Sequence, residues 1–180
     1  RATMCGVPFH SCEGYIARLV AKGYKVAICE QTEDPATAKG LVKRDIIRVI
    51  TPGTVMESSM LDEGRNNYIC CMFSDSKKIG LCFCDISTGE LYATEISGSD
   101  SVNSLTSQLA SYNPREILIG GDIVKIKSLP AFIKSKLSAG VEMLRDESFD
   151  NKLCTDTVNM QFGEEMQCIA DSQVLINAIG

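Results

Sequence analysis

Three apolar stretches follow one another in the middle of the chain with only a few residues between them. They are 68–73, 79–86 and 90–96, and the breaks read SDSKK and STG. Connections this short join antiparallel neighbours, because a parallel crossover needs about a dozen residues or more. The pattern therefore predicts a three-stranded antiparallel meander, around which the rest of the fold must be built.

The middle stretch is apolar on both of its alternating faces. Leu81 and Phe83 share one face, and Cys82, Cys84 and Ile86 share the other. A strand that is apolar on both sides is typical of a sheet buried between two layers. We therefore expect helices to cover both faces of this sheet.

Helical and extended patterns alternate after the meander. A helix carrying Val102, Leu105 and Leu109 is predicted to end at Asn113-Pro114. The further predicted elements are strands at 116–119 and 141–144, helices at 129–137 and 151–162, and an apolar tail, QVLINAIG, that we expect to be a truncated helix. Three antiparallel strands followed by helix, strand, helix, strand and helix is the ribonuclease-H-like α/β plan.

The first quarter of the chain has a different organisation. We predict a helix at 11–22 capped by Ser11, a buried strand at 25–29, a short helix at 35–39 capped by Asp34, and a strand at 45–51 closed by Pro52-Gly53. The following stretch is polar and irregular, which is typical of a linker. The predicted boundaries are 1–54 for a first, partial α/β domain, 55–67 for the linker and 68–180 for the second domain.

Charge is distributed unevenly between these parts. Residues 1–56 contain eight Lys and Arg against five Asp and Glu, a net charge of +3, whereas residues 57–180 contain ten against eighteen, a net charge of −8. Positive charges collect near the second predicted strand: Lys39, Lys43, Arg44 and Arg48. Such a cluster favours salt-sensitive, sequence-independent contact with nucleic-acid phosphates. An ordinary solvated face is an equally good interpretation, because acidic residues lie among them.

Composition indicates the compartment. Nine cysteines in 180 residues is an odd count, and it suits buried free thiols in a reduced cytoplasm. The sequence has no apolar run long enough for a membrane-spanning helix and no start typical of a signal peptide. We therefore predict a cytoplasmic protein without a membrane partner.

Catalytic and metal sites find little support in the sequence. A ribonuclease-H-like nuclease needs carboxylates that converge on two metal ions, but the first strand and first helix of the second domain carry none, and Asp85 and Asp122 alone form no cluster. Cys82-x-Cys84 lacks a second pair of ligands, and His10 is the only histidine. No GxxxxGK[ST] loop for nucleotide phosphates is present. We predict no catalytic residue, metal or cofactor in this chain.

Short motifs along the chain resemble the MutS family of DNA mismatch-repair proteins. Four are similar to the end of its mismatch-recognition domain: GVPFH at 6–10, VAICEQ at 26–31, DPATAKG at 34–40 and VITPGT at 49–54. Four others are similar to its connector domain: NNYI at 66–69, DISTGEL at 85–91, NPREIL at 113–118 and MQFG at 160–163. The first group is specific and the second is looser.

The resemblance implies a non-catalytic part of a protein that binds mismatched DNA. The connector of the family links the DNA-reading domain to the ATPase domains and to MutL, and the full-length protein is a homodimer that uses ATP and Mg²⁺. The Phe-x-Glu motif that wedges into a mismatch is absent from residues 1–54, and we expect the reader and the ATPase to lie outside this chain. The DNA-contact candidates are Met4, Lys43, Arg44 and Arg48, with the two arginines at phosphates. A stand-alone metal-dependent nuclease is the alternative.

Overall fold

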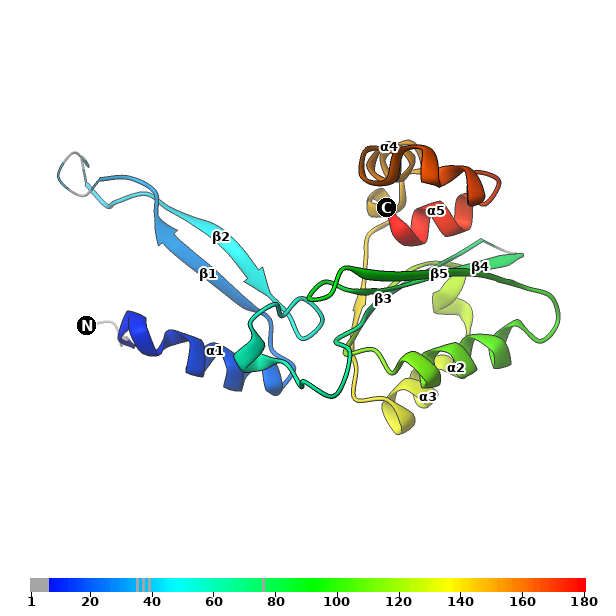
Figure 1. Cartoon of the computed structure of the whole chain (residues 1–180), viewed down its shortest axis with the longest axis horizontal. Helices are drawn as coiled ribbons and strands as arrows, with labels where there is room; N and C mark the ends of the chain where they lie inside the picture. Colours follow the sequence, from blue (N-terminus) through cyan, green and yellow to red (C-terminus); the bar gives the residue numbers. More distant parts are fainter. Residues whose placement is uncertain (1–6, 35, 37, 39, 76) are drawn as a thin grey trace.

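The computed structural model describes residues 7–34, 36, 38, 40–75 and 77–180. This part of the chain contains a two-stranded hairpin beside one helix and a five-stranded sheet between helices (Figure 1). The elements, which agree with the predicted ranges to within about two residues, are α1 (Cys12–Ala21), β1 (Val26–Gln31), β2 (Arg44–Ile50), β3 (Ile69–Ser74), β4 (Lys78–Asp85), β5 (Glu90–Ser97), α2 (Ser101–Tyr112), β6 (Glu116–Gly121), α3 (Leu129–Lys136), β7 (Gly140–Met143), α4 (Asn151–Phe162) and α5 (Gln173–Ile179).

The larger sheet has the strand order β5-β4-β3-β6-β7. Strands β3, β4 and β5 pair antiparallel, so the predicted meander is confirmed, and β6 pairs parallel with both β3 and β7. Each parallel connection runs through a helix, as parallel pairing requires. This order is compatible with the ribonuclease-H-like plan.

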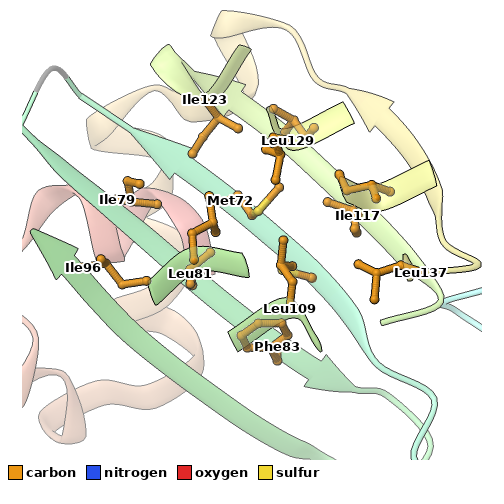
Figure 2. Close-up of a cluster of buried hydrophobic side chains, with 14 residues drawn as sticks. Met72, Ile79, Leu81, Phe83, Ile96, Leu109, Ile117, Ile123, Leu129 and Leu137 are labelled. Carbon is orange, nitrogen blue, oxygen red and sulfur yellow. The ribbon is translucent and has the colours of Figure 1, made fainter. Parts of the chain in front are cut away.

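Helices cover both faces of the larger sheet, as the double apolar pattern of β4 predicted. Figure 1 shows α2 and α3 on one side and α4 and α5 on the other. Figure 2 shows the core on the α2 and α3 side, where Leu81 and Phe83 of β4 lie with Leu109 of α2 and Leu129 of α3. On the opposite face, Gly80 lies directly against the backbone of Val174 at the start of α5.

The hairpin is far more exposed than predicted. Both β1 and β2 are largely solvent-accessible, with Ile46 64% and Ile47 54% exposed, so the expectation of a buried strand at 25–29 is wrong. A two-stranded ribbon has no second layer unless another element covers it, and α1 packs only near its base. There, a small core consists of Ile16, Val20, Ile50 and Val55.

The start of α1 differs from the prediction. Ser11 makes no capping bond to α1, because its hydroxyl donates to the carbonyl of Pro8 instead. The short helix predicted at 35–39 falls on residues 35, 37 and 39, which lie outside the described residues. Between the two sheets, the segment 55–67 contains a 3-10 turn at Ser58–Met60 and packs through Val55. None of the described helices is long and apolar enough to cross a membrane.

Candidate nucleic-acid interface and the junction behind it

Two of the predicted DNA-contact residues lie at the outer end of the hairpin. Lys43 and Arg44 are adjacent where β2 begins, and this end points away from the larger sheet (Figure 1). The Lys43 ammonium is 3.1 Å from Asp45 Oδ2, and its side chain is 70% exposed. The hydrogen bonds from Lys43 and Thr32 lower the pKa of Asp45. Exposed side chains at a projecting end can reach a phosphate with little desolvation.

Arg48 lies elsewhere and has an internal partner. Its Nη1 donates to Glu57 Oε1 at 2.5 Å and its Nη2 to Oε2 at 3.4 Å, in the segment that joins the two sheets. Burial raises the pKa of Glu57, but the hydrogen bonds from Arg48 and from backbone amides outweigh burial, so that the net shift is downward. The register between β1 and β2 slips after Ile28, which leaves Ile47 without a partner and breaks the alternation between Arg44 and Arg48. The arginines therefore form no continuous row.

Replacing Arg48 by alanine should change stability more than DNA affinity. Loss of the partly exposed ion pair with Glu57 should lower the free energy of unfolding by about 0.2–1 kcal/mol, the range of such pairs. Urea unfolding monitored by circular dichroism measures this change, and Glu57→Gln should have a similar effect. A large fall in DNA affinity with unchanged stability would return Arg48 to the nucleic-acid interface.

One other cation and one neutral candidate complete the set. Met4 and Lys39, predicted near the groove and in the basic cluster, lie outside the described residues. The structure thus brings Lys43 and Arg44 together and places Arg48 apart from them. Of the four predicted DNA-contact residues, only Lys43 and Arg44 lie together among the described residues.

The hairpin base docks onto the larger sheet through a buried carboxylate. Glu116 is the first residue of β6 and is only 3% exposed. Its Oε2 accepts a hydrogen bond from the Thr51 hydroxyl and another from the Gly53 amide at 3.2 Å. Asn67 adds a bond from its side-chain amide to the Pro52 carbonyl at 3.0 Å. The turn after β2 is therefore fixed to the larger sheet by polar contacts.

Lys25 supplies the positive charge at this junction. Its ammonium is 3.4 Å from Glu116 Oε1 and also donates to Glu142 Oε2 on β7. The hydrogen bond to Glu142 is the largest influence on the pKa of Lys25; burial opposes it, and the net pKa is raised. Lys25, the residue before β1, is therefore charged at neutral pH. Its side chain contacts two strands of the larger sheet, β6 and β7.

Gly53 allows the turn after β2 to lie against the start of β3 and β6. A Cβ at Gly53 would lie 2.9 Å from the Glu116 Cβ and 3.0 Å from the Ile69 Cβ, closer than carbon atoms normally pack. The Pro-Gly pair, interpreted from the sequence as a strand end, thus also sets the contact between the two sheets. We name Lys25, Thr51, Gly53, Glu116 and Glu142 the junction residues.

The junction residues are not predicted from the sequence. Glu116 was visible as a carboxylate at the start of an otherwise apolar strand, which indicates a buried acid that needs donors. Its partners, however, are 63 and 65 residues distant along the chain. Nothing in their spacing could identify them.

The carboxylates considered for a nuclease have structural roles. Asp85 is 1% exposed, and its Oδ1 accepts from the Ser87 amide at 2.9 Å while Oδ2 accepts from the Asn67 amide at 2.8 Å. Asp122 pairs with Lys125. Within the described part of the chain, no group of three or more His, Cys, Asp or Glu residues is arranged to hold a metal ion.

One Phe-x-Glu tripeptide does occur, outside the part that resembles the recognition domain. It begins at Phe162, the last residue of α4. Phe162 is partly buried and packs against a cluster formed by Cys154, Val158 and Ile176. This phenylalanine therefore contributes to the packing of α4 against α5.

Comparison with known proteins identifies the class. Residues 1–59 match the family described as MutS domain I, and residues 67–180 match MutS domain II. Both are domains of DNA mismatch-repair proteins. The projecting hairpin and the α/β domain onto which it docks therefore belong to this class of protein.

The chain belongs to the MutS family. It is 43% identical over 180 residues to the DNA mismatch repair protein MutS of Ruminiclostridium cellulolyticum, and 42% identical over 180 residues to that of Acetivibrio thermocellus. In each comparison the whole chain is aligned, but it covers only 21% of the relative. The MutS of Caldanaerobacter subterraneus is 37% identical over 182 residues. The chain therefore spans about a fifth of the length of these curated relatives.

Proposed function

We propose that this region carries a phosphate-contacting hairpin and couples it mechanically to the connector of a MutS protein. The observation that carries the proposal is the buried Glu116, which binds the turn after β2 at the edge of the connector sheet. Because the base of the hairpin is fixed at Glu116, a force on the outer end of the hairpin would be transmitted to the edge of this sheet. Chains of packed side chains and hydrogen-bond networks of this kind can carry energetic coupling between distant sites.

The hairpin would contact the DNA backbone and would not read the mismatch itself. Lys43 and Arg44 suit phosphates, which position a protein on DNA without specifying sequence. Wedging into a mismatch needs an apolar or aromatic side chain presented to the minor groove, and we assign that step to parts of a full-length MutS protein outside these 180 residues.

The partners and cofactors of the full-length protein are proposed here on the basis of family membership alone. We propose that the connector passes the position of the hairpin to the ATPase domains and to MutL, within a homodimer that binds ATP and Mg²⁺ elsewhere. The region itself would be non-enzymatic. Asp85, the carboxylate on which the nuclease alternative would depend, is occupied by amide donors.

Fluorescence anisotropy across a salt series tests the hairpin assignment. We expect the 180-residue chain to bind a matched and a G·T-mismatched duplex weakly and equally, with affinity that falls steeply as salt rises. The double variant Lys43→Glu/Arg44→Glu should bind at least about tenfold more weakly and lower the salt slope by about 1–2, the contribution of one or two phosphate contacts.

A matched control separates local contact from overall charge. Lys127→Glu/Lys134→Glu makes the same change in net charge on the connector, where we assign no DNA contact, and should leave affinity nearly unchanged. Equal losses in the two double variants would mean that only net charge matters. A clear preference for the mismatched duplex would require a reader within this chain and would overturn the division of roles.

A further inference from the structure

A groove runs along the segment that joins the two sheets. One hollow of about 540 Å³ is bordered by Tyr68, Tyr112 and Lys136, and a second of about 360 Å³ lies beside α1. The two hollows share the residues Arg65, Asn66, Arg115 and Ser138, so they form one continuous depression. The larger hollow has the size of sites that hold a small molecule.

The charge of this groove is opposite to that of its surroundings. Arg65, Arg115 and Lys136 border it, although residues 57–180 as a whole have a net charge of −8. Among the described residues that line the two hollows, Asp62 is the only acidic one, and it is 4.0 Å from Arg65, at the outer limit of an ion pair. Within the described residues, Arg115 and Lys136 are in no ion pair. Positive charge is therefore available to a ligand.

Hydrogen bonds to two neighbouring segments hold the backbone of Arg115. The amide of Arg115 donates to the Tyr68 carbonyl at 2.8 Å, and the Arg115 carbonyl accepts from the Gly140 amide at 3.0 Å. Asn113 ends α2 in the left-handed conformation, with φ of 45°, and Pro114 after it is buried. Arg115 thus projects from a position fixed between two strands, which reduces the ordering cost of binding.

Negative groups also lie near the groove. Glu90 accepts hydrogen bonds from Asn66 and Tyr68, which border the larger hollow, and the C-terminal ends of α2 and α3 each contribute a partial charge of about −0.5. Together with Asp62 these groups offset most of the three formal positive charges. Glu90 is engaged by Asn66 and Tyr68, however, whereas Arg115 and Lys136 have no ion-pair partner among the described residues and can still donate hydrogen bonds to an anion.

We propose that this groove is a binding site for a small phosphorylated ligand, of a size up to a nucleoside diphosphate. Arg65 and Arg115 would contact the phosphate oxygens, since a guanidinium can donate two hydrogen bonds to one phosphate. Hydroxyl and amide groups of Ser111, Ser138 and Asn113 border the same hollow. A long nucleic-acid strand would meet the acidic surface beyond the groove, whereas a compact anion fits within it.

Isothermal titration calorimetry of the 180-residue chain tests the site. The probes are inorganic pyrophosphate, adenosine diphosphate, adenosine and a ten-nucleotide single strand. We expect saturable binding of the first two and none of adenosine. Arg65→Ala/Arg115→Ala should weaken pyrophosphate binding at least about tenfold, as the loss of bidentate phosphate contacts implies. Lys136→Ala should weaken it by a smaller factor.

Two controls make the outcome decisive. Lys127→Ala/Lys134→Ala removes the same charge from the connector outside the groove, and should bind pyrophosphate as the unaltered chain does. Lys43→Glu/Arg44→Glu should also keep pyrophosphate binding, so failure of the hairpin proposal would be distinguishable from failure of this one. The site is refuted by absence of saturation, by equal weakening in the two double-alanine variants, or by tighter binding of the oligonucleotide than of pyrophosphate.

Discussion

Gly80→Ala should lower the free energy of unfolding by about 3 kcal/mol, at the upper end of the cost of overpacking a core. The added methyl carbon would lie 2.1 Å from the Val174 carbonyl oxygen and 2.6 Å from its carbonyl carbon. Both atoms belong to the helix backbone, so no rotamer change relieves the overlap. Helix α5, which buries Val174 and Leu175 against the sheet, would have to move outward. Urea denaturation gives the energy, and hydrogen exchange of residues 173–179 locates the change.

Gly14→Ala is the matched control. It makes the same chemical change within α1, where a Cβ meets nothing within 4 Å. Because alanine is a better helix former than glycine, this variant should gain about 0.5–1 kcal/mol. If Gly80→Ala unfolded at the same urea concentration as the unaltered chain, with exchange of α5 unchanged, α5 would not contact β4 in the way described.

The larger sheet was predictable because the patterns that determine its central strands lie close together in the sequence. The short breaks around 79–86 permit little other than antiparallel pairing, and the two apolar faces of that strand require a layer on each side. Alternating periods then place the later helices and strands along the chain. The expected element order and the double covering are both observed.

The hairpin was less predictable because strand propensity does not report burial. Isoleucine and valine favour an extended backbone wherever that backbone lies. The apolar residues of 25–29 predict a strand correctly, but the burial expected for that strand is not observed. Ile46 and Ile47 are exposed because α1 reaches only the hairpin base.

The candidate site was predictable only in its basic part. Lys43 and Arg44 are neighbours in sequence and remain neighbours in space. Arg48 has the same charge, but Glu57 holds it at the joining segment, and a count of charges cannot anticipate that. The junction residues depend on contacts between distant positions, and a single sequence contains no direct record of such pairs.

Glu116→Ala should have the largest effect on how the hairpin is held. The Thr51 hydroxyl and the Gly53 amide would lose their buried acceptor, and each such loss costs about 1–3 kcal/mol. Lys25 would keep Glu142 as a partner, so no unpaired charge is added. We expect a total loss of about 2–6 kcal/mol from these two donors. Hydrogen exchange at the Gly53 amide should become much faster, and small-angle X-ray scattering should show a broader distribution of interatomic distances.

Glu142→Gln separates this coupling from simple loss of a charge near Lys25. Glu142 is 43% exposed, and its pair with Lys25 should contribute no more than about 1 kcal/mol. This variant should leave exchange at Gly53 and the scattering profile unchanged. Glu116→Gln should fall between the two, because one side-chain oxygen remains to accept a hydrogen bond. If Glu116→Ala behaved like Glu142→Gln, the buried carboxylate would not fix the hairpin base, and mechanical coupling through the junction residues would have to be abandoned.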